Sequence, residues 1–403
     1  MFPTRRIITS SGDKFRDEFS LAFDGTNDYI ATGGKPVDTA DATYVFWTKS
    51  SVSGSSNRAI FAHGNDRVGE FSLAYDSGGK ALLYLHSSLY QYWDDGAGNS
   101  HVSDGKWHHV AVVVDIDSMP DCKLYIDGVE MPQGARSTSA TATAYGNMEI
   151  GRANSTTEFE GSISELAVYD KHLSISEVKT LYNGREPYNH KEGVCSSNLQ
   201  AWWRMGDGVF DGFPIVQDQT NTNIGSNLVS NPTFDTNTTG WEQYAGGSGD
   251  DNTISRETSI VHSGSGSLKI THAAGNNGYG AKLVGNPLTG TANKLMIIEG
   301  YVYIPSGSYS GGNPILTDGG AFSSASSHSR IEADASITNQ WQYVRTVQIL
   351  DSDVTGTIFL FTTGDDPSAG DILYWDDISV RMLEGNAGQM YNMDADTFKG
   401  DTP

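Results

Sequence analysis

The sequence has little cysteine, few basic side chains and no long apolar run. Only Cys122 and Cys195 are cysteines among 403 residues, too few for a disulfide-stabilised scaffold or a cysteine-rich zinc site. The two could pair across the N-terminal half, or both could be free thiols. Cys122 shares a strand face with Leu124 and Ile126, which favours a buried free thiol. No stretch approaches the about 20 apolar residues of a membrane-spanning helix, so we expect no membrane insertion.

Acidic residues dominate the charge. The 26 Lys and Arg residues are outnumbered by 49 Asp and Glu residues, and the formal net charge is −23. Because binding to nucleic acid depends on basic side chains that neutralise phosphates, we expect no nucleic-acid partner. Two interpretations of the acidity stay open: solubility in a salty medium, or carboxylates gathered around Ca²⁺. The first 15 residues, MFPTRRIITSSGDKF, have no apolar run of about seven residues and do not resemble a secretory signal.

The composition is typical of short strands joined by turns. The chain has 46 glycines, 10% aromatic residues and 37% hydrophobic residues, and its apolar runs are separated by turn pairs such as Asp-Gly. A length of 403 residues favours two domains. We predict an all-β protein with two β-sandwich domains in tandem, one short helix and a Trp-rich connector. The expected parts are an N-terminal arm (1–14), a first sandwich (15–190), a connector (191–226), a second sandwich (227–384) and a C-terminal tail (385–403).

Two adjacent histidines in DGKWHHVAVVVD (104–115) raise the question of a metal or acid–base site. The run from Trp107 to Val114 alternates like a strand, and adjacent residues of a strand point to opposite faces of the sheet. His108 and His109 should therefore lie on opposite faces and serve structural roles. No histidine or cysteine spacing indicates zinc.

One helix is expected in DKHLSISEVKTLYNG (170–184). Leu173, Val178 and Leu181 recur near a helical period, Ser174 or Ser176 can cap the N-terminus, and Asn183 followed by glycine can end the helix. We expect it to cover one edge of the first sandwich.

The tail GNAGQMYNMDADTFKGDTP has too few apolar residues for a core of its own. If it is ordered, it must dock on a neighbour, and contact with a partner chain would favour a homo-oligomer.

The first segment resembles the laminin-G-like, concanavalin A-like jelly rolls. The resemblance depends on LAFDGTNDYI (21–30), GKWHHVAVVVD (105–115), LYIDG (124–128) and FEGSISELAVYDKHLSISEVKTLYNG (159–184). The second segment is similar to the jelly-roll carbohydrate-binding modules of polysaccharide-degrading enzymes, through NLVSNPTFDTNTTGW (227–241), GSGSLKI (264–270), QWQYV (340–344) and LYWDDISV (373–380). These resemblances imply two jelly rolls. They do not fix one function, because such folds serve as lectins, adhesion modules and structural parts.

The second resemblance also implies a structural Ca²⁺ site. In that family an acidic residue after the first-strand Phe and an Asp on the last strand tend to hold the ion, and the matching positions are Asp235 and Asp376 or Asp377. The alternative is that these are surface acids in turns.

Sugar binding needs exposed aromatic rings and nearby hydrogen-bonding groups. Two stretches have this composition, and the alternative for each is a strand end whose aromatics belong to the core. The candidate carbohydrate-binding residues are Tyr90, Tyr92, Trp93, Asp94 and Asn99 in the first sandwich, and Asn276 and Tyr279 in the second.

Catalysis is not expected. Glycosidases of the concanavalin A-like fold carry three acids as E-x-D-x-x-E, whereas Gly161, Ser162 and Ile163 follow Glu160 here. There is also no nucleophile elbow, phosphate-binding loop or dinucleotide-binding turn.

The whole chain is similar to virion proteins of tailed bacteriophages. That resemblance implies a non-enzymatic virion surface protein, either a capsid decoration or a fibre or tail component, assembled in the host cytoplasm, with other virion proteins and cell-surface glycans as partners. The alternative is an extracellular function, as a secreted or cell-surface lectin or a non-catalytic part of a polysaccharide-degrading enzyme.

Overall fold

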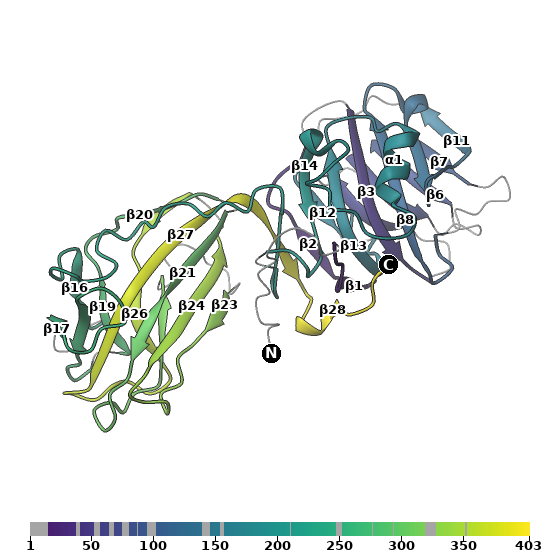
Figure 1. Ribbon diagram of the computed structural model, residues 1–403. Coiled ribbons are helices and arrows are strands. Elements are labelled where there is room, and N and C mark those ends of the chain that lie inside the picture. The colour runs from purple at the N-terminus through teal and green to yellow at the C-terminus, as the bar shows by residue number, and fades with distance from the viewer. Residues whose placement is uncertain are drawn as a thin grey trace. The chain divides into compact units, whose positions relative to one another are not determined.

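The computed structural model divides into two compact units, each with its own hydrophobic core. Unit 1 comprises Met1–Thr222 and Gly385–Pro403, and unit 2 is Asn223–Glu384. The described residues are nearly all β-strand and turn, with one α-helix among them, which confirms the predicted fold class (Figure 1). The structure describes residues 15–37, 41–51, 57–63, 68–74, 80–86, 88–94, 102–138, 146–153, 157–209, 211–246, 252–275, 277–292, 294–318, 328–350 and 353–403.

Unit 1 is a sandwich of two antiparallel sheets. The first sheet contains, in spatial order, β10 (Val129–Glu130), β9 (Lys123–Ile126), β8 (Trp107–Asp115), β3 (Asp41–Lys49), β13 (Glu160–Tyr169), β1 (Ser20–Asp24) and β28 (Phe398–Lys399), with β14 (Leu199–Trp203) also paired to β13. The second contains β11 (Gln133–Thr138), β7 (Leu89–Trp93), β6 (Ala81–His86), β5 (Val68–Ala74), β4 (Asn57–His63), β12 (Met148–Ile150), β2 (Tyr29–Ala31) and the end of β27 (Ile372–Tyr391), which also pairs with β15 (Ile215–Gln217).

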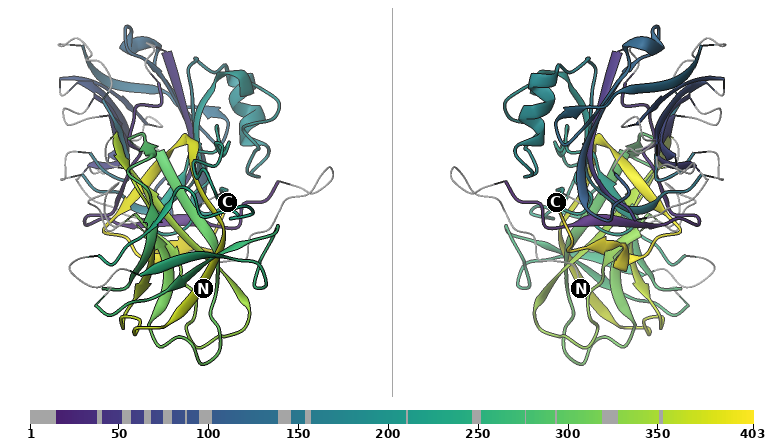
Figure 2. Two further views of the ribbon diagram at one scale, coloured as in Figure 1. Left: turned by 90° about the vertical axis from the view of Figure 1, so that its left-hand side faces the viewer. Right: turned by 90° about the vertical axis from the view of Figure 1, so that its right-hand side faces the viewer.

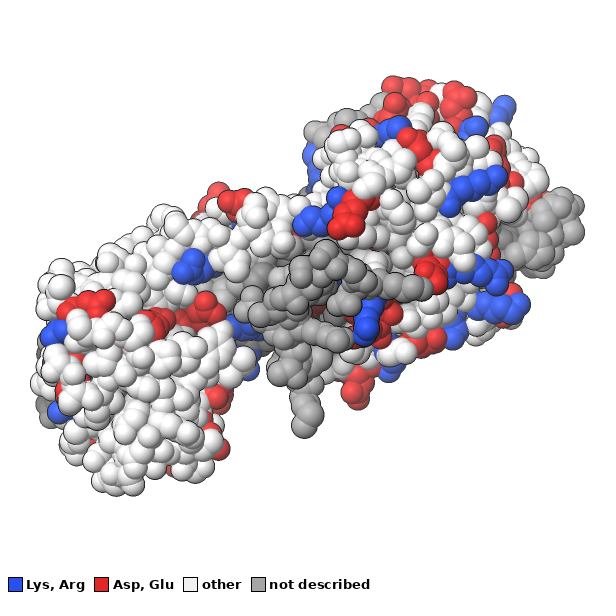
Figure 3. All heavy atoms as spheres, in the orientation of Figure 1, with Lys and Arg blue, Asp and Glu red and all other residues white. Residues whose placement is uncertain are grey.

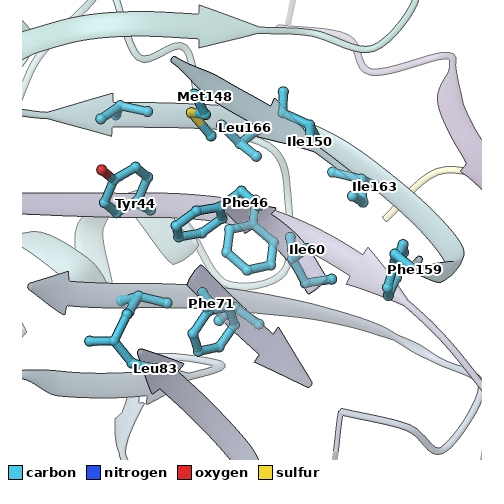
Figure 4. Packing of buried hydrophobic residues seen from close by; sticks show 14 of the residues in the cluster. Tyr44, Phe46, Ile60, Phe71, Leu83, Met148, Ile150, Phe159, Ile163 and Leu166 are labelled. Atoms are coloured by element: carbon cyan, nitrogen blue, oxygen red, sulfur yellow. The ribbon is translucent and has the colours of Figure 1, made fainter. Parts of the chain in front are cut away.

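The interior of unit 1 is rich in aromatic rings. Tyr44 and Phe46, two residues apart on β3, point into the space between the sheets, where Tyr44 stacks on Phe61 of β4 at a centroid distance of 4.3 Å. Phe71 of β5 packs 5.8 Å from Phe61. Figure 4 shows Tyr44, Phe46 and Phe71, which come from both sheets, among aliphatic side chains such as Ile60. The alternation of a strand therefore places every second side chain in one continuous core.

Strand β8 places the two adjacent histidines on opposite faces of its sheet. His109 is buried and packs on Trp47 and Tyr182, and burial lowers its pKa to about 3. His108 lies on the opposite face between Asp104 and Asp127, and the hydrogen bond with Asp127 raises its pKa. The prediction that the pair would be divided between two faces is confirmed.

Helix α1 (Ile175–Tyr182) covers the outer face of the first sheet of unit 1 (Figure 2). Ser174 caps it through a capping box with Glu177, and Asn183 ends it in a left-handed conformation with φ of 50°. Val178 and Leu181 are buried against the sheet. The predicted helix and both of its caps are present.

The C-terminal residues complete unit 1 instead of forming a separate tail. Tyr391 of β27 pairs with Tyr29 of β2, and β28 pairs with β1. The carboxylate of Asp401 accepts hydrogen bonds from Lys49 Nζ (2.6 Å) and Trp107 Nε1 (3.1 Å). Unit 2 ends at Glu384, and the residues expected as a connector, up to Thr222, and as a tail, from Gly385, both belong to unit 1.

The tail docks on its own chain, so its order no longer argues for a partner chain. A homo-oligomer stays a prediction, and the predicted arm at residues 1–14 lies outside the described residues. Both cysteines are free thiols, Cys122 in the core and Cys195 partly exposed.

Unit 2 is a second sandwich. Its larger sheet contains β17 (Thr253–Glu257), β18 (Ser267–Thr271), residues 372–384 of β27, β21 (Lys294–Tyr303), β24 (Trp341–Ile349) and β23 (His328–Ile331). Opposite lie β16 (Trp241–Gln243), β19 (Tyr279–Leu283), β26 (Phe359–Thr363) and β22 (Asn313–Thr317), with a two-stranded ribbon of β20 (Leu288–Gly290) and β25 (Val354–Gly356). The core between them is mainly aliphatic, with Phe234, Trp241 and Trp375 as its rings.

In the described part of the chain, no helix has the length and apolar character needed to cross a membrane. On the face of the molecule drawn in Figure 3, Lys and Arg side chains are scattered among Asp and Glu side chains.

Candidate functional site

The outer face of the larger sheet of unit 2 carries a group of aromatic rings. Strands β21 and β24 pair so that Tyr301 lies opposite Tyr343 and Tyr303 lies opposite Trp341. Their ring centroids are 5.5 and 5.6 Å apart. Tyr374 of β27 extends the group, 5.9 Å from Tyr303. We call these five residues the aromatic face.

Alternation along the two strands explains why these rings face outward. Val302, which lies between Tyr301 and Tyr303, and Val344, which follows Tyr343, are fully buried in the core of unit 2. Tyr301, Tyr303 and Trp341 are each only partly buried. These three rings therefore keep part of their surface in contact with solvent, whereas Tyr374 is buried.

A histidine from a neighbouring loop lies on the aromatic face. The imidazole of His262 stacks on Tyr301 with a centroid distance of 3.7 Å and an interplanar angle of 17°, and it meets Trp341 edge-on at 5.5 Å. Its Nδ1 is 2.5 Å from Oδ2 of Asp377. This contact fixes the orientation of the ring.

Polar groups accompany the rings. The Glu299 carboxylate accepts hydrogen bonds from the Tyr343 hydroxyl (2.6 Å) and from the Ser379 hydroxyl (3.2 Å), and Arg345 is its cross-strand neighbour. Burial and the nearby Glu299 charge raise the pKa of Tyr343, and burial raises the pKa of Tyr374. Both phenols thus stay protonated at neutral pH and can donate hydrogen bonds.

The three acids predicted to bind Ca²⁺ surround one loop, residues 262–265. The Asp235 carboxylate accepts from the backbone N–H of Ser265 (2.5 Å). Asp376 is fully buried and accepts from the N–H groups of His262 (2.9 Å) and Ser263 (3.1 Å). Burial raises its pKa to about 6.

This arrangement is a poor match to a Ca²⁺ site. Calcium needs six to eight oxygen ligands, but the oxygens of these acids face N–H and O–H donors of the loop, including the Ser263 hydroxyl at 2.6 Å from Asp377. Nor, among the described residues, do the three acids form a group in which one carboxylate oxygen of each lies within 4.8 Å of the others. As placed, they act as hydrogen-bond acceptors that hold the loop, and calcium stays a prediction.

The sugar-binding residues predicted in unit 1 are divided between two faces. Tyr90 and Tyr92 lie on the outer face of β7 with their rings edge-to-face at 5.4 Å, and Tyr84 lies beside them. Trp93 follows Tyr92 in the same strand and therefore points inward, where it is fully buried. A buried ring cannot stack on a sugar, so the prediction for Trp93 is wrong. Asp94 is partly buried after the strand, and Asn99 lies outside the described residues.

Of the two sugar-binding residues predicted in the second sandwich, Tyr279 is described, and it does not belong to the aromatic face. Tyr279 belongs to β19 of the smaller sheet and packs on Tyr244, Phe359 and Phe361 at centroid distances of 5.2, 5.2 and 4.7 Å. Burial raises its pKa. Asn276 lies outside the described residues.

Two acids of β13, Glu160 and Glu165, lie in different surroundings. Glu165 is fully buried, with its oxygens hydrogen-bonded to Arg204 Nε (2.9 Å) and Trp202 Nε1 (2.6 Å). Glu160 is exposed at the start of β13. Glu165 is therefore occupied by a structural ion pair.

The aromatic face was not predicted from the sequence, although a signal was present. KLMIIEGYVYIP carries Glu299, Tyr301 and Tyr303 at every second position, and QWQYVRTVQIL carries Trp341, Tyr343 and Arg345 likewise. Period-two spacing places each trio on one face. What the sequence does not show is that the two strands are neighbours in register.

Comparisons with known proteins support the fold. Residues 24–179, within unit 1, match the family model described as the concanavalin A-like lectin/glucanases superfamily. A search among curated proteins found no match.

Several solved structures are similar to parts of the chain. A xylan-binding module, CBM22-1 of Xyn10C from Paenibacillus barcinonensis, is 17% identical over 40% of this chain and 96% of its own length, with a TM-score of 0.30. A putative carbohydrate-binding protein from Bacteroides ovatus is 15% identical over 50% of this chain and 56% of its own, with a TM-score of 0.34. A heptameric pentraxin from Limulus polyphemus is 17% identical over 41% of this chain and 82% of its own length, with a TM-score of 0.31.

Proposed function

We propose that the protein is a non-catalytic glycan-binding protein and that the aromatic face of unit 2 holds the sugar chain. The observation that supports this proposal is the row of outward rings, Tyr301, Tyr303, Trp341 and Tyr343, on two paired strands. Sugar rings have apolar C–H faces that stack on aromatic rings, while their hydroxyl groups need polar partners. The Glu299 carboxylate, which also accepts from the Tyr343 and Ser379 hydroxyls, supplies such a partner beside the rings.

The match of unit 1 to a family that includes lectins is in line with this proposal. It also suggests a second place for sugar, the outer tyrosines of β7. The two faces can be distinguished, because their rings come from different units.

The test is binding of the full chain to a panel of soluble and insoluble polysaccharides, measured by affinity electrophoresis and by calorimetry on any that bind. Trp341→Ala should weaken binding about 30-fold, since loss of a central ring from a binding surface costs about 2 kcal/mol. Tyr90→Ala makes the corresponding change at the second place, in unit 1, and should leave the affinity unchanged because unit 2 holds the sugar.

Absence of binding to every polysaccharide in the panel would remove the proposal. Loss of binding in Tyr90→Ala but not in Trp341→Ala would move the site to unit 1. Release of reducing sugar by the purified chain would contradict the non-catalytic part.

The setting in which the protein acts is a separate proposal. An extracellular lectin, or a binding part of a polysaccharide-degrading enzyme, fits the aromatic face directly. The bacteriophage virion role rests on the sequence resemblance alone and stays a prediction. Finding the chain in fixed stoichiometry in purified particles would support the virion role, and finding it only as a free glycan binder would contradict it.

A further inference from the structure

Three residues far apart in the sequence meet at one end of the first sheet of unit 1. Asp41 begins β3, Asp115 ends β8, and His172 precedes α1. One carboxylate oxygen of each aspartate and one ring nitrogen of the histidine all lie within 4.8 Å of one another. We propose that Asp41, Asp115 and His172 bind one divalent transition-metal ion. This proposal does not depend on glycan binding.

The distances fit ligands of a single ion. Nε2 of His172 is 3.2 Å from Oδ1 of Asp41. Two atoms that each lie about 2.1 Å from one metal are about 3.0–3.4 Å apart in octahedral or tetrahedral geometry. The same nitrogen donates a hydrogen bond to the carbonyl oxygen of Val114 (3.0 Å). A metal ion on this nitrogen would replace the donated proton, and the carbonyl oxygen would then be placed to act as a fourth ligand from β8.

The strand pairing gives an electrostatic reason for a cation. Asp41 and Asp115 are directly opposite one another in the β3–β8 ladder. Like charges directly opposite across a pair of strands destabilise the sheet. A bound cation between them would reverse the sign of that interaction, and the net charge of −23 raises the local concentration of cations.

The position of His172 is fixed through the backbone of its two neighbours. The Thr43 hydroxyl, two residues along β3 from Asp41, donates to the carbonyl of Lys171 (2.6 Å) and accepts from the N–H of Leu173 (3.0 Å). Thr43 thus holds the residues on both sides of His172. Asp115 is held as well, because its Oδ1 accepts from the N–H groups of Asp117 and Ser118, each at 2.9 Å.

The donor set indicates which ion would bind. One imidazole nitrogen with two carboxylates suits Zn²⁺ and its first-row neighbours, whereas Ca²⁺ and Mg²⁺ prefer oxygen alone. His108 illustrates the contrast: its two aspartates contact different ring nitrogens, Asp127 at Nδ1 and Asp104 at Nε2. Those two aspartates therefore cannot share one ion with a single nitrogen of His108.

The test uses the full chain, stripped with chelator and returned to Zn²⁺. Metal analysis after gel filtration should find one bound zinc per chain, and the melting temperature should rise because the ion binds only the folded state. His172→Gln should weaken zinc binding at least about tenfold. His262→Gln is the matched control, since its side chain is similarly exposed (28% against 33%) and contacts one aspartate only.

Asp41→Asn provides a second variant if His172→Gln fails to fold, because Asp41 is an exposed residue and its loss should still cut the affinity. Absence of stoichiometric zinc in the wild type would overturn the proposal. Equal loss of zinc in His262→Gln, or full retention in both His172→Gln and Asp41→Asn, would overturn it as well.

Discussion

Unit 1 has a cluster of aromatic rings between its sheets, whereas unit 2 has one on an outer sheet surface. In unit 1 the rings fill the interior, where Tyr44, Phe46, Phe61 and Phe71 contact one another between the two sheets (Figure 4). In unit 2 the interior is mainly aliphatic, and an outer sheet surface carries the aromatic face. Two sandwiches of the same fold class therefore place clusters of aromatic side chains in different positions.

The difference separates two uses of an aromatic ring. A ring between sheets adds buried apolar area and edge-to-face contacts that stabilise the fold. A ring on the outside is available to a ligand, although pairs across strands also stabilise a sheet by about 0.2–1 kcal/mol. Substitutions can show which use dominates at each position.

The largest effect is expected from a ring in the interior of unit 1. Phe61 is fully buried and contacts Tyr44 and Phe71. Phe61→Ala should lower the free energy of unfolding of unit 1 by about 3–5 kcal/mol, because it leaves a cavity that its neighbours cannot fill. Tyr301→Ala should lower the free energy of unfolding of unit 2 by about 1 kcal/mol or less. Urea unfolding followed by tryptophan fluorescence and circular dichroism measures both.

Equal losses in the two variants would break the comparison. In that case the outer rings of unit 2 would be structural, and the argument for a ligand on them would weaken.

The second effect concerns pH and should also be larger in unit 1. Asp17 accepts hydrogen bonds from the Ser164 hydroxyl, and burial, together with the charges of Glu165 and Asp207, raises its pKa to about 10. Burial likewise raises the pKa of Glu165 to about 7, despite its pairing with Arg204. Carboxyl groups with raised folded-state pKa values favour folding below their unfolded pKa values. That contribution is lost as pH rises through the folded values.

Unit 1 should therefore lose at least about 1 kcal/mol of stability between pH 5 and pH 9. In unit 2 the raised pKa of Asp376, about 6, confines the corresponding loss to the range between its usual value and about pH 6. Asp17→Asn keeps the hydrogen-bonding shape and should flatten the pH profile of unit 1. A stability that is constant or rises from pH 5 to pH 9 in the wild type would contradict this prediction.

Local sequence patterns predicted the local structure well. Alternation in WHHVAVVVD located β8 and divided its histidines between two faces, because a strand's geometry is set by adjacent residues. The helix ends followed from Ser174 and Asn183 for the same reason. Trp93 was misplaced because β7 extends through it, and one residue along a strand changes the face on which a side chain lies.

Contacts between distant segments could not be predicted from one sequence. The aromatic face needs β21 beside β24, and the proposed metal site needs residues 41, 115 and 172 together. The return of the C-terminal residues to unit 1 is of the same kind: its polar composition suggested a tail, while β28 and Asp401 find partners near the start of the chain. Such pairings depend on topology, which spacing along the chain does not encode.

A smaller effect is expected on the aromatic face itself. Tyr343→Phe keeps the ring and removes the hydroxyl that donates to Glu299. Loss of one hydrogen bond to a carboxylate should lower the free energy of unfolding of unit 2 by about 1 kcal/mol. If the face binds sugar mainly by stacking, affinity should change less than in Trp341→Ala, and calorimetry on the two variants compares them. A larger affinity loss in Tyr343→Phe would show that the hydroxyl group, and not the ring, makes the main contact.

The smallest effect is expected where the C-terminal residues meet unit 1. Lys49 and Trp107 both contact the Asp401 carboxylate, and the hydrogen bond with Lys49 lowers its pKa. A pKa that is lower in the folded state than in the unfolded state stabilises the fold at pH values above the unfolded-state pKa. That stabilisation is lost as the pH falls through the folded-state pKa. Because the pair is largely solvent-exposed, Asp401→Asn should lower the stability of unit 1 by no more than about 1 kcal/mol, with a smaller effect at high salt. Urea unfolding at low and high ionic strength tests this. A loss of several kcal/mol that salt does not reduce would mean that the Asp401 contacts, and not the strand pairing of β27 and β28, hold the C-terminal residues on unit 1.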